Sequence, residues 1–220
     1  MPIPKRYLAD FHQNAVYHVY NRTNNREKLF ITEENFVFFL KKYQQYLSKY
    51  LDTFSWNLLT NHFHFVVRVK TENAIRASLV AAGEDKRSLT ETNYIENRCT
   101  LSELIEQAFK RFFQCYAQSF NKWHKRNGNL FYTPFKRILL EHPEDIIRAL
   151  VYVHRNPFKH GLTKDFTTYP WSSWKNYLNE TKNDFICTDV LNLFKNRDDF
   201  IRAHEQLLEP EEKPSFWIED

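Results

Sequence analysis

Two histidines with one residue between them have a spacing that suits chemistry. His62 and His64 flank Phe63 at the start of a run that alternates as a β-strand does. Because successive strand residues point to opposite faces, both imidazoles lie on one face, about 6.6 Å apart along the strand. They can converge on one metal ion, or they can be two histidines on an exposed sheet face.

A tyrosine and an asparagine four residues apart form the second candidate pair. Tyr152 and Asn156 lie near the end of an amphipathic run that begins at Pro143. Residues four apart share one face of a helix, so the hydroxyl and the amide oxygen are presented together. Taken alone, packing and capping explain this pair. Only its combination with the histidines makes a functional role for the pair worth considering.

The surrounding pattern predicts the elements that position these residues. Strands are expected over 15–21, 54–59, 62–69 and 135–141, and helices over 33–50, 101–126 and 143–156. The last helix is expected to stop near Asn156, because Pro157 disfavours helical geometry in the residue before it. This order predicts an α+β fold: a ferredoxin-like split βαβ unit with a four-stranded antiparallel sheet and helices on one face, plus a C-terminal extension. Residues 70–100 show no sustained period and are expected to be an inserted connection of variable form.

Four sequence blocks follow one another in the order of a known family. They are residues 17–22 (YHVYNR), 61–65 (NHFHF), 152–162 (YVHRNPFKHGL) and 169–173 (YPWSS). Together they resemble the HUH-type single-tyrosine transposases of the insertion-sequence-200-like group, and specifically the REP-associated tyrosine transposases. The resemblance runs from about Tyr17 to Ser173.

The resemblance implies a role for each candidate residue. His62, His64 and Asn156 would be metal ligands, and mixed nitrogen and oxygen ligation suits Mg²⁺ or Mn²⁺. Tyr152 would be the nucleophile, attacking single-stranded or hairpin DNA to leave a 5′-phosphotyrosine link. The competing tyrosine, Tyr116, lies in an apolar helical stripe and is expected to be core.

Charge and aromatic content also favour a nucleic-acid partner. The chain carries a net charge of +4, and residues 205–220 carry a net charge of −5, so the preceding residues carry +9. Cations neutralise phosphates and aromatic faces stack on unpaired bases, although a charge run is also typical of a solvated face. The expected DNA-binding residues are Arg22, Lys122, Lys125, Arg126, Lys136, Arg137, Arg155 and Lys159.

Composition limits the class of protein. No apolar stretch reaches the ~20 residues of a membrane span, and the first residues lack the apolar core of a secretory signal, so a cytoplasmic protein is expected. Three widely spaced cysteines suggest neither a disulfide framework nor a zinc knuckle. The expected organisation is a catalytic domain over 1–175, with the insert 70–100, and a C-terminal extension with an acidic tail over 176–220.

Two other functions fit the same pattern. One is a non-catalytic ferredoxin-like nucleic-acid-binding module, which would bind without cleavage or metal dependence. The other is a domesticated host enzyme that processes chromosomal repeats. The sequence does not distinguish a monomer from a homodimer that exchanges tyrosine helices. It also leaves the DNA target and the native metal open.

Overall fold

A four-stranded antiparallel sheet forms the centre of the molecule. The computed structural model describes residues 4–178 and 186–206. The strands β1 (Val16–Arg22), β2 (Leu51–Leu58), β3 (His62–Val69) and β4 (Lys136–Leu140) lie in the order β2-β3-β1-β4. Helices α1 (Glu33–Leu47) and α4 (Leu101–Trp123) occur in the two connections that complete a split βαβ unit. The predicted α+β, ferredoxin-like sheet is therefore confirmed.

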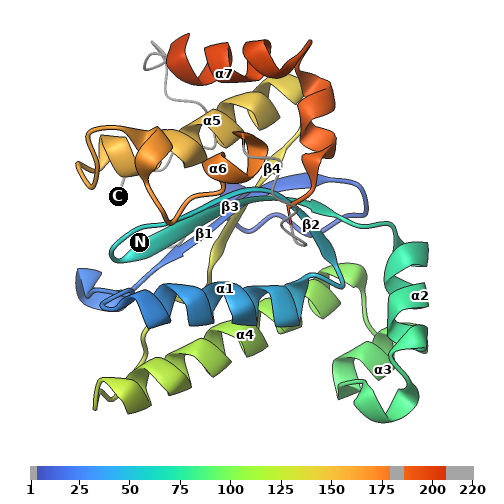
Figure 1. The fold of residues 1–220 in the computed structure, drawn as a ribbon. Coiled ribbons are helices and arrows are strands. Elements are labelled where there is room, and N and C mark those ends of the chain that lie inside the picture. The colour runs from blue at the N-terminus through green and yellow to red at the C-terminus, as the bar shows by residue number, and fades with distance from the viewer. Residues whose placement is uncertain (1–3, 179–185, 207–220) are drawn as a thin grey trace.

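Helices α1 and α4 cover one face of this sheet with an aromatic core (Figure 1). Phe65 of β3 stacks on Tyr43 of α1 with ring centroids 4.1 Å apart, and Phe39 of α1 contacts Phe112 of α4 with ring centroids 4.8 Å apart. Strand alternation puts Phe63 and Phe65 on this face and turns His62 and His64 away from it. The aromatic core thus fixes which face of β3 carries the imidazoles.

The opposite face is covered too, which the expectation of helices on one face did not include. Helix α5 (Pro143–Lys159) lies across β2 and β3, and α6 (Trp174–Leu178) and α7 (Arg197–Gln206) pack beside it (Figure 1). Val66 and Ile138 point into this second core. A sheet with apolar residues on both faces needs two covering layers, and the unbroken apolar run after His64 was the signal for this. The one-face arrangement holds for α1 and α4 only.

The insert over 70–100, for which the sequence predicted no particular structure, contains two short helices. It forms α2 (Glu72–Ala81) and α3 (Leu89–Ile95), which pack against each other and, through α3, against α4. Thr71 Oγ1 accepts from Ala74 N, and Ser88 Oγ accepts from Glu91 N. Helices of 10 and 7 residues are too short to show a periodic pattern, so their capping residues were the only sequence signal.

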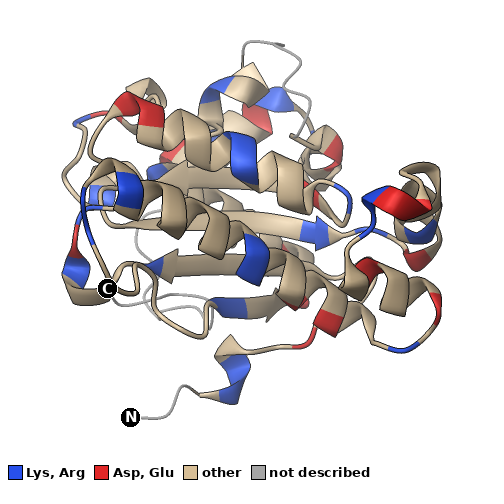
Figure 2. Ribbon diagram, turned by 90° about the horizontal axis from the view of Figure 1, so that it is seen from below, with Lys and Arg blue, Asp and Glu red and all other residues tan. Residues whose placement is uncertain are grey.

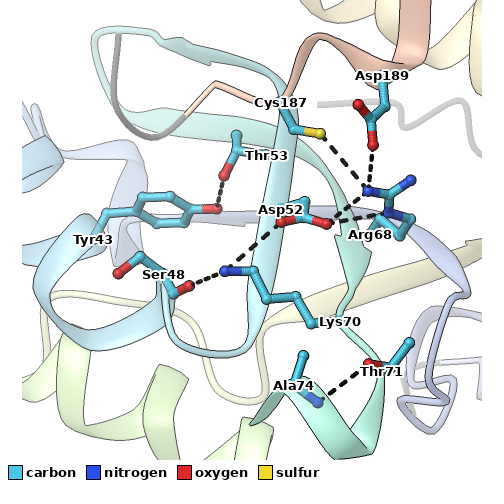
Figure 3. Close-up of polar contacts among 10 residues, drawn as sticks. All are labelled: Tyr43, Ser48, Asp52, Thr53, Arg68, Lys70, Thr71, Ala74, Cys187 and Asp189. Carbon is cyan, nitrogen blue, oxygen red and sulfur yellow. Dashed lines mark hydrogen bonds and ion pairs between the residues drawn. The ribbon is translucent and has the colours of Figure 1, made fainter. Parts of the chain in front are cut away.

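The C-terminal segment is attached to the sheet edge through a cluster of polar contacts (Figure 3). Arg68 of β3 donates to Oδ2 of Asp52 and to Oδ2 of Asp189, each at 2.8 Å. Next to it, Cys187 N donates to Thr53 O at 2.8 Å. Apolar residues of the segment 186–206 also pack in the second core, together with α5. The acidic tail from 207 onwards lies outside the described residues, and the division at residue 175 stays a prediction.

Charge is distributed unevenly along α4. Figure 2 shows blue segments at the end of α4 and in the turn after it, whereas red segments alternate with blue ones around α2, α3 and the start of α4. Residues 122–137 contain five cations and no acid.

In the described ranges, no helix combines the length and the hydropathy needed to cross a bilayer.

Candidate functional site

His62 begins β3 and turns its ring toward α5. The β2–β3 hairpin ends there, with Leu59 N donating to His62 O at 2.8 Å. Nδ1 of His62 lies 2.7 Å from Oδ1 of Asn61. This amide oxygen can only accept, so a neutral His62 carries its proton on Nδ1 and keeps the lone pair on Nε2. The side chain is buried and Nε2 is shielded from solvent.

His64 lies deeper in the same face and contacts a third histidine. Its Nδ1 is 3.0 Å from Nε2 of His18 on β1, and its Nε2 is buried without a hydrogen-bond partner in the described part of the chain. Burial, followed by the charges of His18 and His62, holds the pKa of His64 well below its ordinary value. The ring is therefore neutral. When it donates Nδ1–H to His18, its Nε2 lone pair is available to a ligand.

Tyr152 meets these histidines from α5, and Asn156 follows it one helical turn later. The rings of Tyr152 and His64 stand perpendicular with centroids 5.5 Å apart, and His18 lies 5.8 Å from the tyrosine ring. Nζ of Lys159 lies 5.7 Å from the centroid of the Tyr152 ring. A cation at this distance favours negative charge on the phenol.

Asn156 is the most unusual polar group of the site. It is 1% exposed, yet within the described residues neither its Oδ1 nor its Nδ2 has a hydrogen-bond partner. Buried amides almost always find partners, so an amide without one needs an explanation. A cation bound to its Oδ1 would supply one.

The helix that carries this pair continues past Pro157, which corrects the expected end near Asn156. Pro157 lies inside α5, and the helix ends at Lys159. Gly161 then adopts a φ of 67°, with Gly161 N donating to Phe158 O and Leu162 N donating to Pro157 O. These two bonds form a Schellman motif, which requires a left-handed residue and so favours glycine. The glycine, rather than the proline, ends the helix.

A buried hydrogen-bond network holds the outer side of α5. His204 Nδ1 lies 2.8 Å from Phe200 O, and its Nε2 lies 2.9 Å from Nδ1 of His154. The other nitrogen of His154 lies 2.8 Å from Ser173 Oγ, which accepts from Trp56 N. Because the carbonyl of Phe200 only accepts, His204 donates to it from Nδ1 and accepts at Nε2 from Nδ1 of His154. The other nitrogen of His154 then accepts from the Ser173 hydroxyl. Burial lowers the pKa of both histidines, so both are neutral.

The donors of the site match a divalent cation only when the amide is included. In the described ranges, no three His, Cys, Asp or Glu side chains are placed to hold a metal. Two imidazole lone pairs at His62 and His64 and the Oδ1 of Asn156 make a mixed nitrogen and oxygen set. Such a set suits Mg²⁺ or Mn²⁺ better than a closed structural zinc site. The residues present therefore fit a divalent metal.

The competing tyrosine lies on the other face of the sheet. Tyr116 is fully buried in the α1–α4 core and donates to Leu29 O at 2.9 Å. Burial raises the pKa of its hydroxyl far above the ordinary value. It is a packing residue with no contact to the histidines of β3.

Three of the arginines expected to bind DNA are used inside the fold. Arg137 is 5% exposed, pairs with Glu106 and donates to Ala9 O. Arg126 donates to Oε2 of Glu27 at 2.6 Å, and Arg155 donates to the backbone oxygen of His204 at 2.6 Å. The sequence could not distinguish these from surface cations.

Other cations lie near the site or at the surface. The guanidinium of Arg22, which pairs with His62 in the sheet, lies 4.8 Å from the ring centroid of Tyr132, and Tyr132 is 44% exposed. Nζ of Lys136 lies 5.1 Å from the ring centroid of Tyr20, which stacks on His64. Lys122 and Lys125 are exposed at the end of α4.

His18 and Tyr20 belong to the site but were not singled out in the sequence. They share a face of β1 because they are two residues apart, and register places Tyr20 opposite His64. The alternation of residues 16, 18 and 20 was the available signal, yet it does not tell which strand becomes the neighbour of β3.

Comparison with known proteins supports the fold. No protein-family model and no curated protein matches the chain. Among solved structures it is similar to a REP-associated tyrosine transposase bound to a REP hairpin, with a TM-score of 0.54 and 15% identity. The match covers 86% of this chain and 93% of that one.

The chain has the fold of a REP-associated tyrosine transposase. The likeness to the transposase extends over most of the chain, as the resemblance from Tyr17 to Ser173 predicted. At this level of identity the transposase establishes the architecture, and the roles of individual residues rest on the geometry described above.

Proposed function

We propose that the protein is a metal-dependent single-tyrosine endonuclease and strand transferase acting on single-stranded or hairpin DNA, in DNA transposition or repeat mobilisation. The observation that carries this proposal is the contact between Tyr152 and His64, with the buried amide of Asn156 one helical turn away. A nucleophile next to neutral nitrogen ligands suits phosphoryl chemistry. The REP hairpin bound by the similar transposase agrees with this class of partner.

Tyr152 would carry out a transesterification. Its phenol oxygen attacks the scissile phosphorus, forming a tyrosyl–phosphorus bond while the bond from phosphorus to the 3′ oxygen breaks. The phenol proton leaves to solvent or a base, and the departing 3′ oxygen takes up a proton as a hydroxyl. The covalent link conserves the phosphodiester, so attack by a 3′-hydroxyl rejoins a strand. Lys159 would favour the negative charge that develops on the phenol oxygen.

His62, His64 and Asn156 would hold Mg²⁺ or Mn²⁺ through two imidazole nitrogens and one amide oxygen. When bound there, the ion would neutralise charge on the phosphoryl oxygens. The hydrogen bond from His62 to Asn61 keeps a lone pair on Nε2 of His62. A hydrogen bond donated by Nδ1 of His64 to His18 would do the same for Nε2 of His64. This arrangement prepares the nitrogens as ligands before any ion arrives.

The DNA strand would approach along the cations that border the site. Arg22 lies beside His62 in the sheet, and Lys159 lies beside the ring of Tyr152. Lys136 contacts the ring of Tyr20. The exposed ring of Tyr132, held by Tyr132 N donating to Arg22 O at 3.0 Å, offers a face on which an unpaired base can stack. Lys122 and Lys125 extend the positive surface toward the end of α4.

The test uses labelled hairpin oligonucleotides with single-stranded flanks, with Mn²⁺ or Mg²⁺, resolved on a denaturing gel. We expect a protein-linked DNA band that disappears when EDTA is added. A fully paired duplex of the same sequence serves as the control and should give no band. Tight binding without a covalent band across hairpins and flanks of varied sequence would favour the non-catalytic binding module instead.

A further inference from the structure

Proline at position 157 removes one hydrogen bond near the C-terminal end of α5. A helical N–H donates to the carbonyl four residues earlier, and proline has no N–H. The carbonyl left without its donor is that of Val153. Because Val153 is buried, this oxygen cannot turn to solvent for a replacement.

A side chain from the sheet supplies the missing donor. Asn57 of β2 is fully buried, and its Nδ2 donates to Val153 O. The orientation of the amide is chemically fixed, because only its N–H group can face a carbonyl oxygen. Leucine or valine at position 57 would leave the carbonyl without a partner, and aspartate would set one oxygen against another.

The position of Asn57 links the two halves of the proposed site. Asn57 is the direct register partner of His64, so both side chains rise from neighbouring strands on the face that α5 covers. Val153 lies in the helical turn that begins at Tyr152 and ends at Asn156. One hydrogen bond therefore joins the sheet beside His64 to the turn that carries the tyrosine and the amide.

We propose that Asn57 is a positioning residue, which replaces the donor that Pro157 lacks and so sets Tyr152 and Asn156 against the histidines. The catalytic part of this inference rests on the proposed function. The structural part, a hydrogen bond that matters only because residue 157 is proline, does not.

The structural part is tested by a double-variant cycle in thermal unfolding of the full chain. Asn57→Val should lower Tm by roughly 3–10 °C, because it leaves Val153 O buried without a donor. Pro157→Ala restores an N–H at position 157, so the double variant should recover at least half of that loss. Additive effects of the two substitutions would overturn the inference.

Ser55→Ala is the matched control on the same strand. The Ser55 hydroxyl is buried and, within the described residues, has no hydrogen-bond partner. Its removal should leave both Tm and attachment rate close to wild type, and should not couple to Pro157→Ala. A loss as large as that of Asn57→Val would mean that any change in β2 disturbs the helix.

The catalytic part is tested by attachment kinetics and by metal binding. Asn57→Val should slow covalent attachment to the hairpin oligonucleotide by about 10- to 100-fold, with DNA affinity in EDTA within twofold of wild type. It should also weaken Mn²⁺ binding, measured by calorimetry without DNA, and Pro157→Ala should recover both. Wild-type attachment and Mn²⁺ affinity in Asn57→Val would overturn the positioning role.

The outcomes separate the two proposals. A wild-type protein that attaches no DNA would overturn the proposed function together with the catalytic part of this inference, whereas the Tm cycle would still decide whether Asn57 replaces the donor. If Asn57→Val does not fold, the double variant decides: its folding supports the inference, and its failure to fold opposes it.

Discussion

Nε2 of His18 lies 3.0 Å from Nδ1 of His64, so the tautomers of a histidine on β1 and a histidine on β3 are coupled. A neutral imidazole has one N–H, and donating it to His18 leaves the lone pair of His64 on Nε2. Groups that orient a ligand histidine typically change metal affinity 10- to 100-fold when removed. In the proposed metal site, this contact would give His18 the role of orienting His64, which its position in the sequence did not reveal.

His18→Phe should raise the Mn²⁺ concentration needed for half-maximal attachment by about 10- to 100-fold. The phenyl ring keeps the packing but cannot accept from His64. Tyr17→Phe, on the opposite face of β1, removes the hydrogen bonds of the Tyr17 hydroxyl with Asp10 O and His12 N, both far from His64, and should leave the Mn²⁺ dependence unchanged. An unaltered Mn²⁺ titration in His18→Phe would show that His64 does not need this partner.

Tyr152→Phe should abolish the covalent band while leaving DNA affinity unchanged, because it removes the nucleophile oxygen and keeps the ring. Tyr116→Phe is the matched control. It should keep full attachment and lose only about 1 kcal/mol of unfolding free energy, for the hydrogen bond to Leu29 O. A band that persists in Tyr152→Phe would mean that another residue is the nucleophile.

A mixture of Tyr152→Phe and His64→Ala proteins should attach no DNA. Tyr152 and His64 meet within one chain here, so neither variant carries a complete site. Recovery of the covalent band on mixing, read on the same denaturing gel, would instead indicate that two chains exchange their α5 helices.

Lys136 and Arg137 are neighbours in sequence but should respond differently to substitution. Lys136→Ala should reduce the slope of log affinity against log salt by about 1, because it removes one phosphate contact. Arg137→Met should leave that slope unchanged and lower the unfolding free energy by roughly 3 kcal/mol, since it breaks the pair with Glu106. Salt titrations and urea unfolding of both variants check this, and equal salt slopes in the two variants would contradict it.

Stability should fall as the pH is lowered, through His204. Burial, and to a smaller extent Arg155, lowers the pKa of His204 to about 3, although the bond to Phe200 O opposes the shift. The unfolded chain takes up this proton near pH 6.5, about 3.5 units above the folded protein. The contribution to unfolding free energy is therefore complete above about pH 6.5 and declines toward pH 3, by up to about 1.4 kcal/mol per pH unit.

His204→Gln should make the unfolding free energy decline less steeply as the pH falls, as measured by urea unfolding between pH 7.5 and pH 5. The slope should decrease by the contribution of one proton. Glutamine still presents an amide that can donate to Phe200 O, but it does not titrate. Parallel stability curves for the wild-type protein and the variant would show that His204 is not responsible for the decline.

Local patterns were sufficient wherever the relevant geometry spans a few residues. The strand over His62–Val69 was predicted at its observed bounds, and its alternation placed both histidines on one face. The predicted helix start at Pro143 is also observed. The predicted end of the same helix was wrong. The rule that a residue before proline avoids helical geometry placed the end too early, whereas the Schellman motif at Gly161 determines it.

The sequence by itself determined the strand that carries His62 and His64, and the four-residue spacing that puts Tyr152 and Asn156 on one helical face, because both follow from backbone periodicity. Only the tertiary structure decided that His18 contacts His64, that Asn57 reaches Val153, and that Arg137 is buried while Lys136 is not. These are contacts between distant segments, and strand register, helix docking and loss of solvent determine them. No local pattern encodes which segments meet.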